Sequence, residues 1–266
     1  MKREVSPPTS MPEEVEFDRI APIYDETRPR PSEGELGALT ALFSGCRTVL
    51  DAGVGTGRFA APLRSHGFEV IGIDLSLGMM RRARAKGVPH LVRATLFHLP
   101  LADRSVDAAF MAHVLQLLPD ASRALRELGR VARRQVVVQL PEWLERSPPE
   151  AWRLRRARYV ELAAEMGYPV PERGQRYRYT LEDLSAVASP TAVHVVPLSR
   201  APGENTDERL SRWAAEMIGG GHIPPEVHGE ILRRLRAEFL ADPSGTDRPR
   251  TARFIAWDPV RLRAGT

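Results

Sequence analysis

The sequence predicts an α/β protein with a doubly wound, mainly parallel sheet, an antiparallel C-terminal edge strand and a mostly helical cover. Three observations support this prediction. Short apolar runs rich in β-branched residues alternate with helical stretches through the first half of the chain. A glycine-rich segment follows the first of these runs and opens a helix. After residue 140 the pattern becomes mainly helical, with two strand-like runs.

Five short apolar runs predict the parallel strands. They are rich in valine, isoleucine and leucine, as expected for strands that are buried on both faces of a sheet. They cover residues 47–52, 68–74, 89–94, 106–112 and 135–140. Two later runs, at 192–198 and 251–257, predict the strands that complete the sheet.

Helical stretches separate these strands, as the crossovers of a parallel sheet require. The stretch at 58–66 ends at a glycine, and Pro62 within it predicts a late start or a kink. The next stretches cover 77–86 and 120–132, and the second carries apolar residues on one face. Before the first strand, residues 15–43 look mostly helical with one interruption.

The remaining helical stretches predict a cover over one end of the sheet. They cover residues 148–166, 181–188 and 205–240. We therefore expect four parts in the chain. These are a flexible N-terminus at 1–14, a ligand-binding α/β core with its N-terminal helix at 15–140, a helical cap with one sheet strand at 141–250, and the last strand at 251–257.

Composition limits the class of protein. The net charge is +4, nearly all of it from arginine, but nucleic-acid binding needs a localised basic patch rather than a positive total. Cys46 is the only cysteine, which excludes an internal disulfide and favours a reducing cytoplasm. We expect no metal, because the histidines lack metal-ligand spacing. No apolar run is long enough for a membrane span, and we expect no signal peptide.

Three glycines after the first strand predict a ligand site. Gly53, Gly55 and Gly57 allow a tight turn and close approach of a ligand to the backbone. Ligands of open α/β sheets bind outside the carboxyl ends of the strands, where this segment lies. Asp51 precedes the glycines, and Asp74 ends the second strand, where it can accept hydrogen bonds from two ribose hydroxyls.

The spacing departs from two common phosphate-binding patterns. The dinucleotide fingerprint needs its third glycine at position 58, which is an arginine here, and no Gly-Lys-Ser/Thr follows as in a P-loop. A strand-to-helix turn without a ligand would explain each glycine, but it would not explain the two aspartates that accompany them.

At these residues the sequence resembles the class I S-adenosylmethionine (SAM)-dependent methyltransferases, which are Rossmann-like, and within them the small-molecule "type 11" group. "VLDAGVGTGRFA" resembles their first motif and "GIDLSLGMMRRAR" their second. "LPLADRSVDAAFMAHVLQLLPD" resembles the stretch that leads through the fourth strand. "FDRIAPIYDETRP" resembles the N-terminal helix that closes over the cofactor in many members. The resemblance covers about residues 15–140.

The resemblance implies SAM as the cofactor and methyl donor and S-adenosylhomocysteine (SAH) as the product. It implies that the cofactor-binding residues are Tyr24, Asp51, Gly53, Gly55, Gly57, Asp74, Leu75, Met79, Thr95, Leu96 and His113. The family often has an acid for the adenine amino group where Thr95 stands, so backbone groups and apolar packing are expected to hold adenine here.

Candidates for contact with the methyl acceptor are fewer. His113 ends the fourth strand and is the candidate base, with cofactor packing or a structural role as alternatives. Glu142 and Trp143 follow the fifth strand and are expected to line the acceptor pocket, unless they form an ordinary loop. Tyr177 and His222 are weaker substrate candidates, on loops that resemble a clamp and a lid.

Four functions remain open at this point. The long cover favours an enclosed pocket and a small-molecule acceptor. A tRNA or other RNA methyltransferase would instead need a continuous basic surface beside the cofactor. A dinucleotide-dependent oxidoreductase is disfavoured by the glycine spacing, and a silent SAM-binding protein would bind the cofactor without methylating anything. The sequence indicates neither the acceptor nor the oligomeric state.

Overall fold

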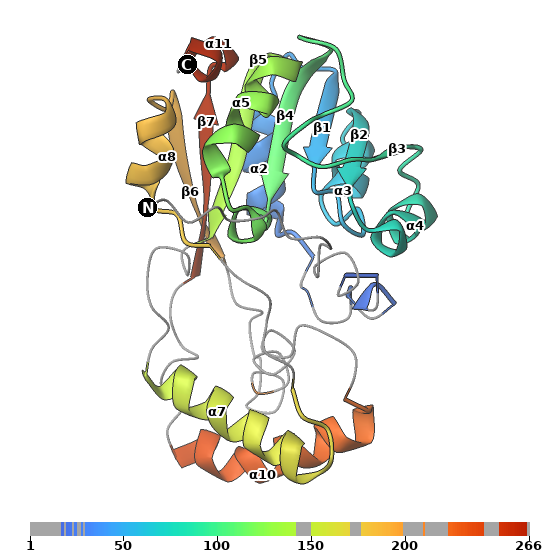
Figure 1. The fold of residues 1–266 in the computed structure, drawn as a ribbon, viewed down its shortest axis with the longest axis vertical. Coiled ribbons are helices and arrows are strands. Elements are labelled where there is room, and N and C mark those ends of the chain that lie inside the picture. Colours follow the sequence, from blue (N-terminus) through green and yellow to red (C-terminus); the bar gives the residue numbers. More distant parts are fainter. Residues whose placement is uncertain are drawn as a thin grey trace, which may run out of the picture.

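The computed structural model of the protein describes residues 17–18, 20–22, 24–25, 28, 30–141, 150–170, 177–198, 210, 223–241 and 250–264. These residues form a seven-stranded sheet with helices on both faces, and a helical pair lies at one end of the sheet (Figure 1). In the described part of the chain, no helix has the length and apolar character needed to cross a membrane.

The sheet confirms the predicted α/β class. Its strands are β1 (Thr48–Ala52), β2 (Glu69–Asp74), β3 (His90–Arg93), β4 (Val106–Ala112), β5 (Ala132–Pro141), β6 (Ala192–Leu198) and β7 (Arg250–Trp257). Their order is β3-β2-β1-β4-β5-β7-β6, and all pairs from β3 to β5 are parallel. The C-terminal strand β7 is antiparallel, as predicted, but it lies one place in from the edge because β6 pairs with its outer side.

Two apolar layers hold the helices against the sheet. The helices are α2 (Glu33–Leu42), α3 (Ala60–Ser65), α4 (Leu77–Ala85), η1 (Leu115–Leu117), α5 (Ala121–Val131), α7 (Glu150–Glu165), α8 (Leu181–Val187), α10 (Pro225–Ala241) and α11 (Pro259–Ala264). One layer joins the sheet to α5, α8 and α11, and the other joins it to α2, α3 and α4. Both faces of the central strands are therefore buried, which explains their continuous apolar sequences.

Some elements differ from the prediction. The late start expected near Pro62 is confirmed, since α3 begins only at Ala60 and proline is tolerated in a first helical turn. Strand β5 begins at Ala132, directly after α5 and three residues before the predicted 135, because Ala132 already pairs with Val106 of β4 and the register then shifts before Gln135 pairs with Ala108. Helix α11 was not predicted, and it packs on α5 where Gly129 leaves room for Leu262.

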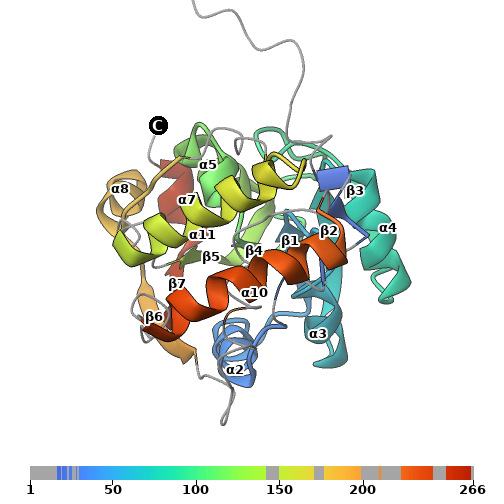
Figure 2. The same ribbon diagram turned by 90° about the horizontal axis from the view of Figure 1, so that it is seen from below.

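Helices α7 and α10 form a small apolar core of their own. Buried residues from both helices meet there, together with Leu210: Tyr159, Leu162, Ala163, Ile231, Leu235 and Phe239. The pair lies beyond the carboxyl ends of β1 and β4 in Figure 1, and it crosses in front of these strands when the molecule is seen from that end in Figure 2. We call the α7–α10 pair the cap.

Helix α8 does not belong to the cap, although 181–188 was expected to form part of the cover. Leu184 is fully buried in the layer between the sheet and α5, and the Tyr179 side chain packs against the same layer. The helix begins with a capping box, in which Thr180 and Asp183 exchange side-chain to backbone hydrogen bonds. Its amphipathic face therefore completes the main core.

Candidate active site

The glycine segment lies where the strand order reverses, between β1 and β4. Gly53 N and Val54 N both donate to Ile73 O, at 2.7 and 2.9 Å, which holds the turn against the end of β2. The φ angle of Gly53 is +82°, and a Cβ atom there would clash with Val114, which follows β4. Glycine therefore lets the segments after β1 and β4 meet at the position where open α/β sheets bind ligands.

Asp74 is fixed at the end of β2 by two backbone groups. Gly55 N donates to its Oδ2 at 2.7 Å, and Ser76 N donates to its Oδ1 at 2.9 Å. Each carboxylate oxygen can accept a further hydrogen bond, so the group remains able to bind hydroxyls. Burial raises the pKa of Asp74 above its usual value. A Cβ atom at Gly55 would meet no atom of the described residues within 4 Å, so this glycine borders space that they leave open.

Asp51 is the second-last residue of β1, and it is buried, with only 3% of the residue exposed. Burial, together with the nearby Asp74 carboxylate, raises its pKa to about 7. None of the described lysines or arginines forms an ion pair with it. A positively charged ligand would lower its pKa again and would be bound more tightly by the ionised form.

The N-terminal segment packs on the start of α4. Ile20 and Met79 are buried in one small apolar cluster. Oδ1 of Asp18 accepts hydrogen bonds from Ser76 Oγ and Gly78 N, both at 2.6 Å, and the first of these contacts does most to lower the pKa of Asp18. A Cβ atom at Gly78 would lie 2.9 Å from that oxygen, so glycine is needed for this approach.

A second contact ties the N-terminal segment to the glycine segment itself. Thr56 lies between two of the glycines and is 1% exposed. Its Oγ1 donates to Asp25 Oδ1 at 2.6 Å and accepts from Lys86 Nζ at 3.2 Å, while Lys86 Nζ also lies 2.6 Å from Asp25 Oδ1. Burial opposes ionisation of Asp25, but the hydrogen bonds from Lys86 and Thr56 outweigh it and lower its pKa.

Other predicted cofactor residues surround this loop. Leu75 and Met79 flank the start of α4, and Met79 is buried. Tyr24 is half-buried against the same cluster. Thr95 and Leu96 follow β3, and Leu96 is buried in the core layer. The structure therefore brings these residues to the carboxyl side of β2 and β3.

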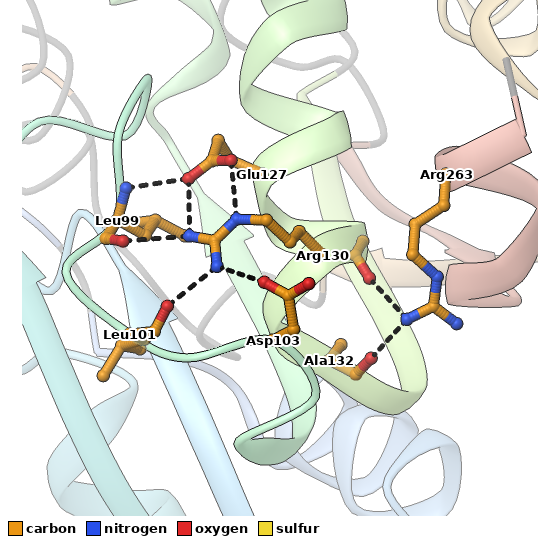
Figure 3. A network of polar contacts seen from close by, with 8 residues as sticks. Leu99, Leu101, Asp103, Glu127, Arg130, Ala132 and Arg263 are labelled. Atoms are coloured by element: carbon orange, nitrogen blue, oxygen red, sulfur yellow. Dashed lines mark hydrogen bonds and ion pairs between the residues drawn. The ribbon is translucent and has the colours of Figure 1, made fainter. Parts of the chain in front are cut away.

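The loop that carries Thr95 and Leu96 is held to α5 by one guanidinium group (Figure 3). Arg130 donates at 2.8 to 2.9 Å to Leu99 O, Leu101 O, Asp103 Oδ1 and both carboxylate oxygens of Glu127. Glu127 Oε2 also accepts from Leu99 N at 2.8 Å. These contacts raise the pKa of Arg130 and lower that of Glu127, and they fix the backbone of this loop.

His113 follows β4 directly and lies at the same junction. Its φ angle is +57°, an uncommon value for a residue other than glycine. Its ring stacks on Phe59 with 6.3 Å between centroids, and its carbonyl oxygen accepts from Gln116 Nε2 at 2.7 Å. The structure thus places His113 beside the glycine segment, where a catalytic role stays a prediction.

The tyrosines of the segment before α8 have separate surroundings. Tyr177 N donates to Gln116 O at 2.9 Å, so this residue lies next to the segment after β4. Tyr179 OH donates to Leu118 O at 2.6 Å and accepts from Ala121 N at 3.2 Å, so it anchors the start of α8 to α5. Three predicted substrate residues lie outside the described residues: Glu142, Trp143 and His222.

Sequence reasoning missed Asp18, Asp25 and Lys86. Two signals were available for them. Both aspartates flank Tyr24 in the quoted N-terminal motif, and Lys86 is one of two lysines in an arginine-rich chain. Among the described residues, no group of three or more histidine, cysteine, aspartate or glutamate side chains could hold a metal ion.

The fold and the site define a doubly wound α/β protein with a ligand site at the carboxyl ends of its central strands. Residues 50–138 match the family model described as a methyltransferase domain. The chain is 32% identical over 183 residues to a ubiquinone/menaquinone biosynthesis C-methyltransferase from Syntrophotalea carbinolica, covering 64% of this chain and 77% of that protein. It is 38% identical over 120 residues to a malonyl-[acyl-carrier protein] O-methyltransferase from Yersinia pestis, covering 44% of this chain and 45% of that protein.

A solved structure extends the likeness over most of the fold. It is described as a methyltransferase of an antibiotic biosynthesis pathway from Anabaena variabilis, and it covers 88% of this chain and 99% of its own, with a TM-score of 0.60 and 16% identity. The chain belongs to the class I SAM-dependent methyltransferases. Its cofactor is SAM.

Proposed function

We propose that this methyltransferase acts on a small-molecule acceptor held between the carboxyl edge of the sheet and the cap. The observation that carries the proposal is the position of α7 and α10, which lie beyond the strand ends that build the cofactor site. A helical cover beyond the strand ends would enclose the acceptor, which suits a small molecule better than a polymer. The names of the two relatives, which concern quinone and malonyl-carrier methylation, support the same class of acceptor.

The residues present fit SAM. Asp74, with its remaining acceptor capacity, would hold the ribose hydroxyls, and the open space at Gly55 would let the cofactor approach the backbone. Asp51 would bind the cationic methionine end, since it is a buried carboxyl group with no described counter-cation. The remaining cofactor positions, Gly53 and Gly57, would shape the loop.

Adenine would lie between the start of α4 and the loop after β3. Leu75 and Met79 would provide apolar contact from one side, and Thr95 and Leu96 from the other. Tyr24 would cover the cofactor from the N-terminal segment, which Asp18 and Asp25 tie to α4 and to Thr56. Together, these contacts would fix one orientation of the methyl donor.

When bound, SAM supplies a methyl group on a sulfonium, which an acceptor lone pair attacks in line while the electrons of the broken C–S bond stay on sulfur. The chain's own part is to align the two reactants and to exclude water. His113 follows β4 at the junction of the β1 and β4 segments and would contact the reactants there, as would Tyr177. Glu142, Trp143 and His222 remain proposed acceptor contacts.

The proposed layout is a cofactor core over 15–140 and a cap segment over 141–250, from which α8 returns to the core. Some of the described cap arginines are paired with glutamates, which argues against a continuous RNA-binding surface on the cap. Arg158 pairs with Glu161 at 3.2 Å, and Arg234 pairs with Glu230 at 2.8 Å, so their charges are compensated within the cap. We also propose a cytoplasmic location, supported by the composition with one cysteine.

Transfer of labelled methyl groups from SAM into a fractionated cell extract tests the proposal. We expect label in the low-mass or organic-soluble fraction. Label in RNase-sensitive material would instead make the exposed arginines the acceptor surface. Binding of SAM with no transfer to any fraction would leave a cofactor-binding protein and would contradict the proposed activity.

A further inference from the structure

A second buried carboxyl group, Glu35, lies at the carboxyl edge of the sheet and is not one of the proposed cofactor contacts. Glu35 in the first turn of α2 is 4% exposed, and Gln139 near the end of β5 is 3% exposed. Oε2 of Glu35 accepts from Ser32 N at 2.8 Å and from Ser32 Oγ at 3.0 Å, which forms the capping box of α2. Oε1 of Glu35 accepts from Gln139 Nε2 at 3.0 Å.

The Glu35 contact fixes the orientation of the Gln139 amide. Because a carboxylate oxygen only accepts hydrogen bonds, the amide nitrogen must face Glu35, and the amide oxygen must point away from it. That oxygen, Gln139 Oε1, is buried and has no hydrogen-bond donor among the residues that the structure describes. A buried acceptor without a donor is unfavourable, and a ligand that donates a hydrogen bond would relieve this.

The pair lies on the side of the sheet that faces α2, close to the end of β4. Gln139 is in register with Ala112, the residue before His113, and with Phe254 of β7. Asp51 lies on the same face, because its register partner Phe110 belongs to the same apolar layer as Phe254.

In the described part of the chain, this face carries several acceptor groups and few cations. The described residues provide no ion pair for either Glu35 or Asp51. Arg253, the nearest basic residue in the register of β7, alternates to the other face of the sheet. A negatively charged group beside a free carbonyl oxygen is suited to a ligand that carries both positive charge and N–H donors.

We propose that Glu35 and Gln139 bind the ammonium group of the methyl acceptor, which makes the substrate a small-molecule amine. The carboxylate of Glu35 provides the charge, and Gln139 Oε1 accepts one N–H bond. The inference rests on the proposed small-molecule methyltransferase activity and assigns the chemical class of its substrate. Both residues act in recognition of the acceptor.

The test compares three probes with the same aromatic body on the SAH-saturated protein. Phenethylamine carries an ammonium group, phenethyl alcohol a neutral donor, and hydrocinnamate a carboxylate. We expect phenethylamine to bind most tightly by titration calorimetry, on the order of tenfold more tightly than the alcohol, and hydrocinnamate to bind most weakly. Any other order overturns the proposal.

Variants assign the effect to the pair. Glu35→Gln removes the charge and keeps an acceptor for the capping box, and Gln139→Leu removes the free carbonyl oxygen. Each is expected to weaken phenethylamine binding on the order of tenfold. The matched control is Glu33→Gln, an equal change of charge at an exposed position in the same helical turn, which should leave the affinity unchanged.

Two results would overturn the inference. Unchanged phenethylamine affinity in both Glu35→Gln and Gln139→Leu would mean that the pair only caps α2. An equal loss of phenethylamine affinity in Glu33→Gln would mean that binding depends on the overall charge of α2 and not on the Glu35–Gln139 pair. The affinity for SAH is measured in the same series, so failure of amine selectivity with normal SAH binding removes this inference alone. Absence of SAH binding would contradict the proposed function as well.

Discussion

Asp74→Asn tests the assignment of the cofactor ribose. The carboxylate of Asp74 accepts from Gly55 N and Ser76 N through different oxygens, and the remaining acceptor positions are those proposed for the ribose hydroxyls. Asparagine keeps the shape of the side chain but has one acceptor oxygen and no charge. One backbone bond is therefore lost, and a charge-assisted bond to the ribose becomes a neutral one or is not formed.

The size of the effect follows from these contacts. A hydrogen bond to a charged group contributes about 1.5 to 3 kcal/mol, so loss of one ribose contact should weaken SAH binding roughly 10- to 150-fold. Titration calorimetry measures this directly. The thermal midpoint is recorded alongside, because the lost bond from Gly55 or Ser76 is also expected to lower the stability of the loop.

Asp107→Asn is the matched control. Asp107 also accepts from two backbone groups, Arg47 N at 2.9 Å and Thr48 N at 3.0 Å, and the Thr48 contact does most to lower its pKa to about 2. It lies at the amino end of β4, away from the proposed site. The control should lose stability and keep its SAH affinity. A dissociation constant for Asp74→Asn within about threefold of the wild-type value would refute the ribose assignment.

Three further predictions follow from the site. Burial raises the folded-state pKa of Asp51 to about 7, above its ordinary 3.8, so SAM affinity measured by titration should rise between pH 5.5 and pH 7.5. The stability that protonated Asp51 contributes to the folded protein should be lost as the pH rises through about 7. A pH-dependent SAM affinity that persists in Asp51→Asn would contradict this prediction. Lys86→Met should free the N-terminal segment, so that chymotrypsin cleaves faster after Tyr24, whereas Lys86→Arg should stay protected. Equal cleavage rates in the two variants would show that the ion pair between Lys86 and Asp25 does not hold this segment. Arg130→Met should lower the free energy of unfolding by about 2 to 3 kcal/mol in urea titrations, because it removes the contacts to the loop carbonyls. The control Arg126→Met on the same helix should lower it by less than about 0.5 kcal/mol. Similar losses in both variants would show that the Arg130 contacts add little to the stability of the fold.

Much of the sheet could be predicted because its central strands are buried on both faces. Strands β1, β2 and β4 are mainly apolar runs, and the predicted bounds of β1 to β4 lie within a residue or so of the observed ones. The start of β5 was harder to predict, because two arginines separate Ala132, which already pairs with Val106 of β4, from the strand-like run at 135–140. Helix α11 was not predicted, because it is short and its packing depends on the contact between Leu262 and Gly129 of a helix far away in the sequence.

The candidate site was likewise predictable only in part. The aspartates and glycines of the two motifs were predictable, since each belongs to one strand end and one turn. Asp18 could not be placed from the sequence, because its partner Ser76 lies 58 residues away. Gln139 was read as part of an apolar strand, and the pairing of its amide with Glu35 depends on how α2 packs on the sheet. Local patterns predict elements, whereas contacts between distant segments need the fold.

The most direct test of the account is a crystal structure of the protein with SAH. The account predicts the ribose hydroxyls within hydrogen-bond distance of the Asp74 carboxylate, the ligand backbone over Gly55, and the methionine amino group on the side of Asp51. A complex with SAH bound elsewhere, or with the ribose held by other residues, would contradict the assignment of the cofactor site.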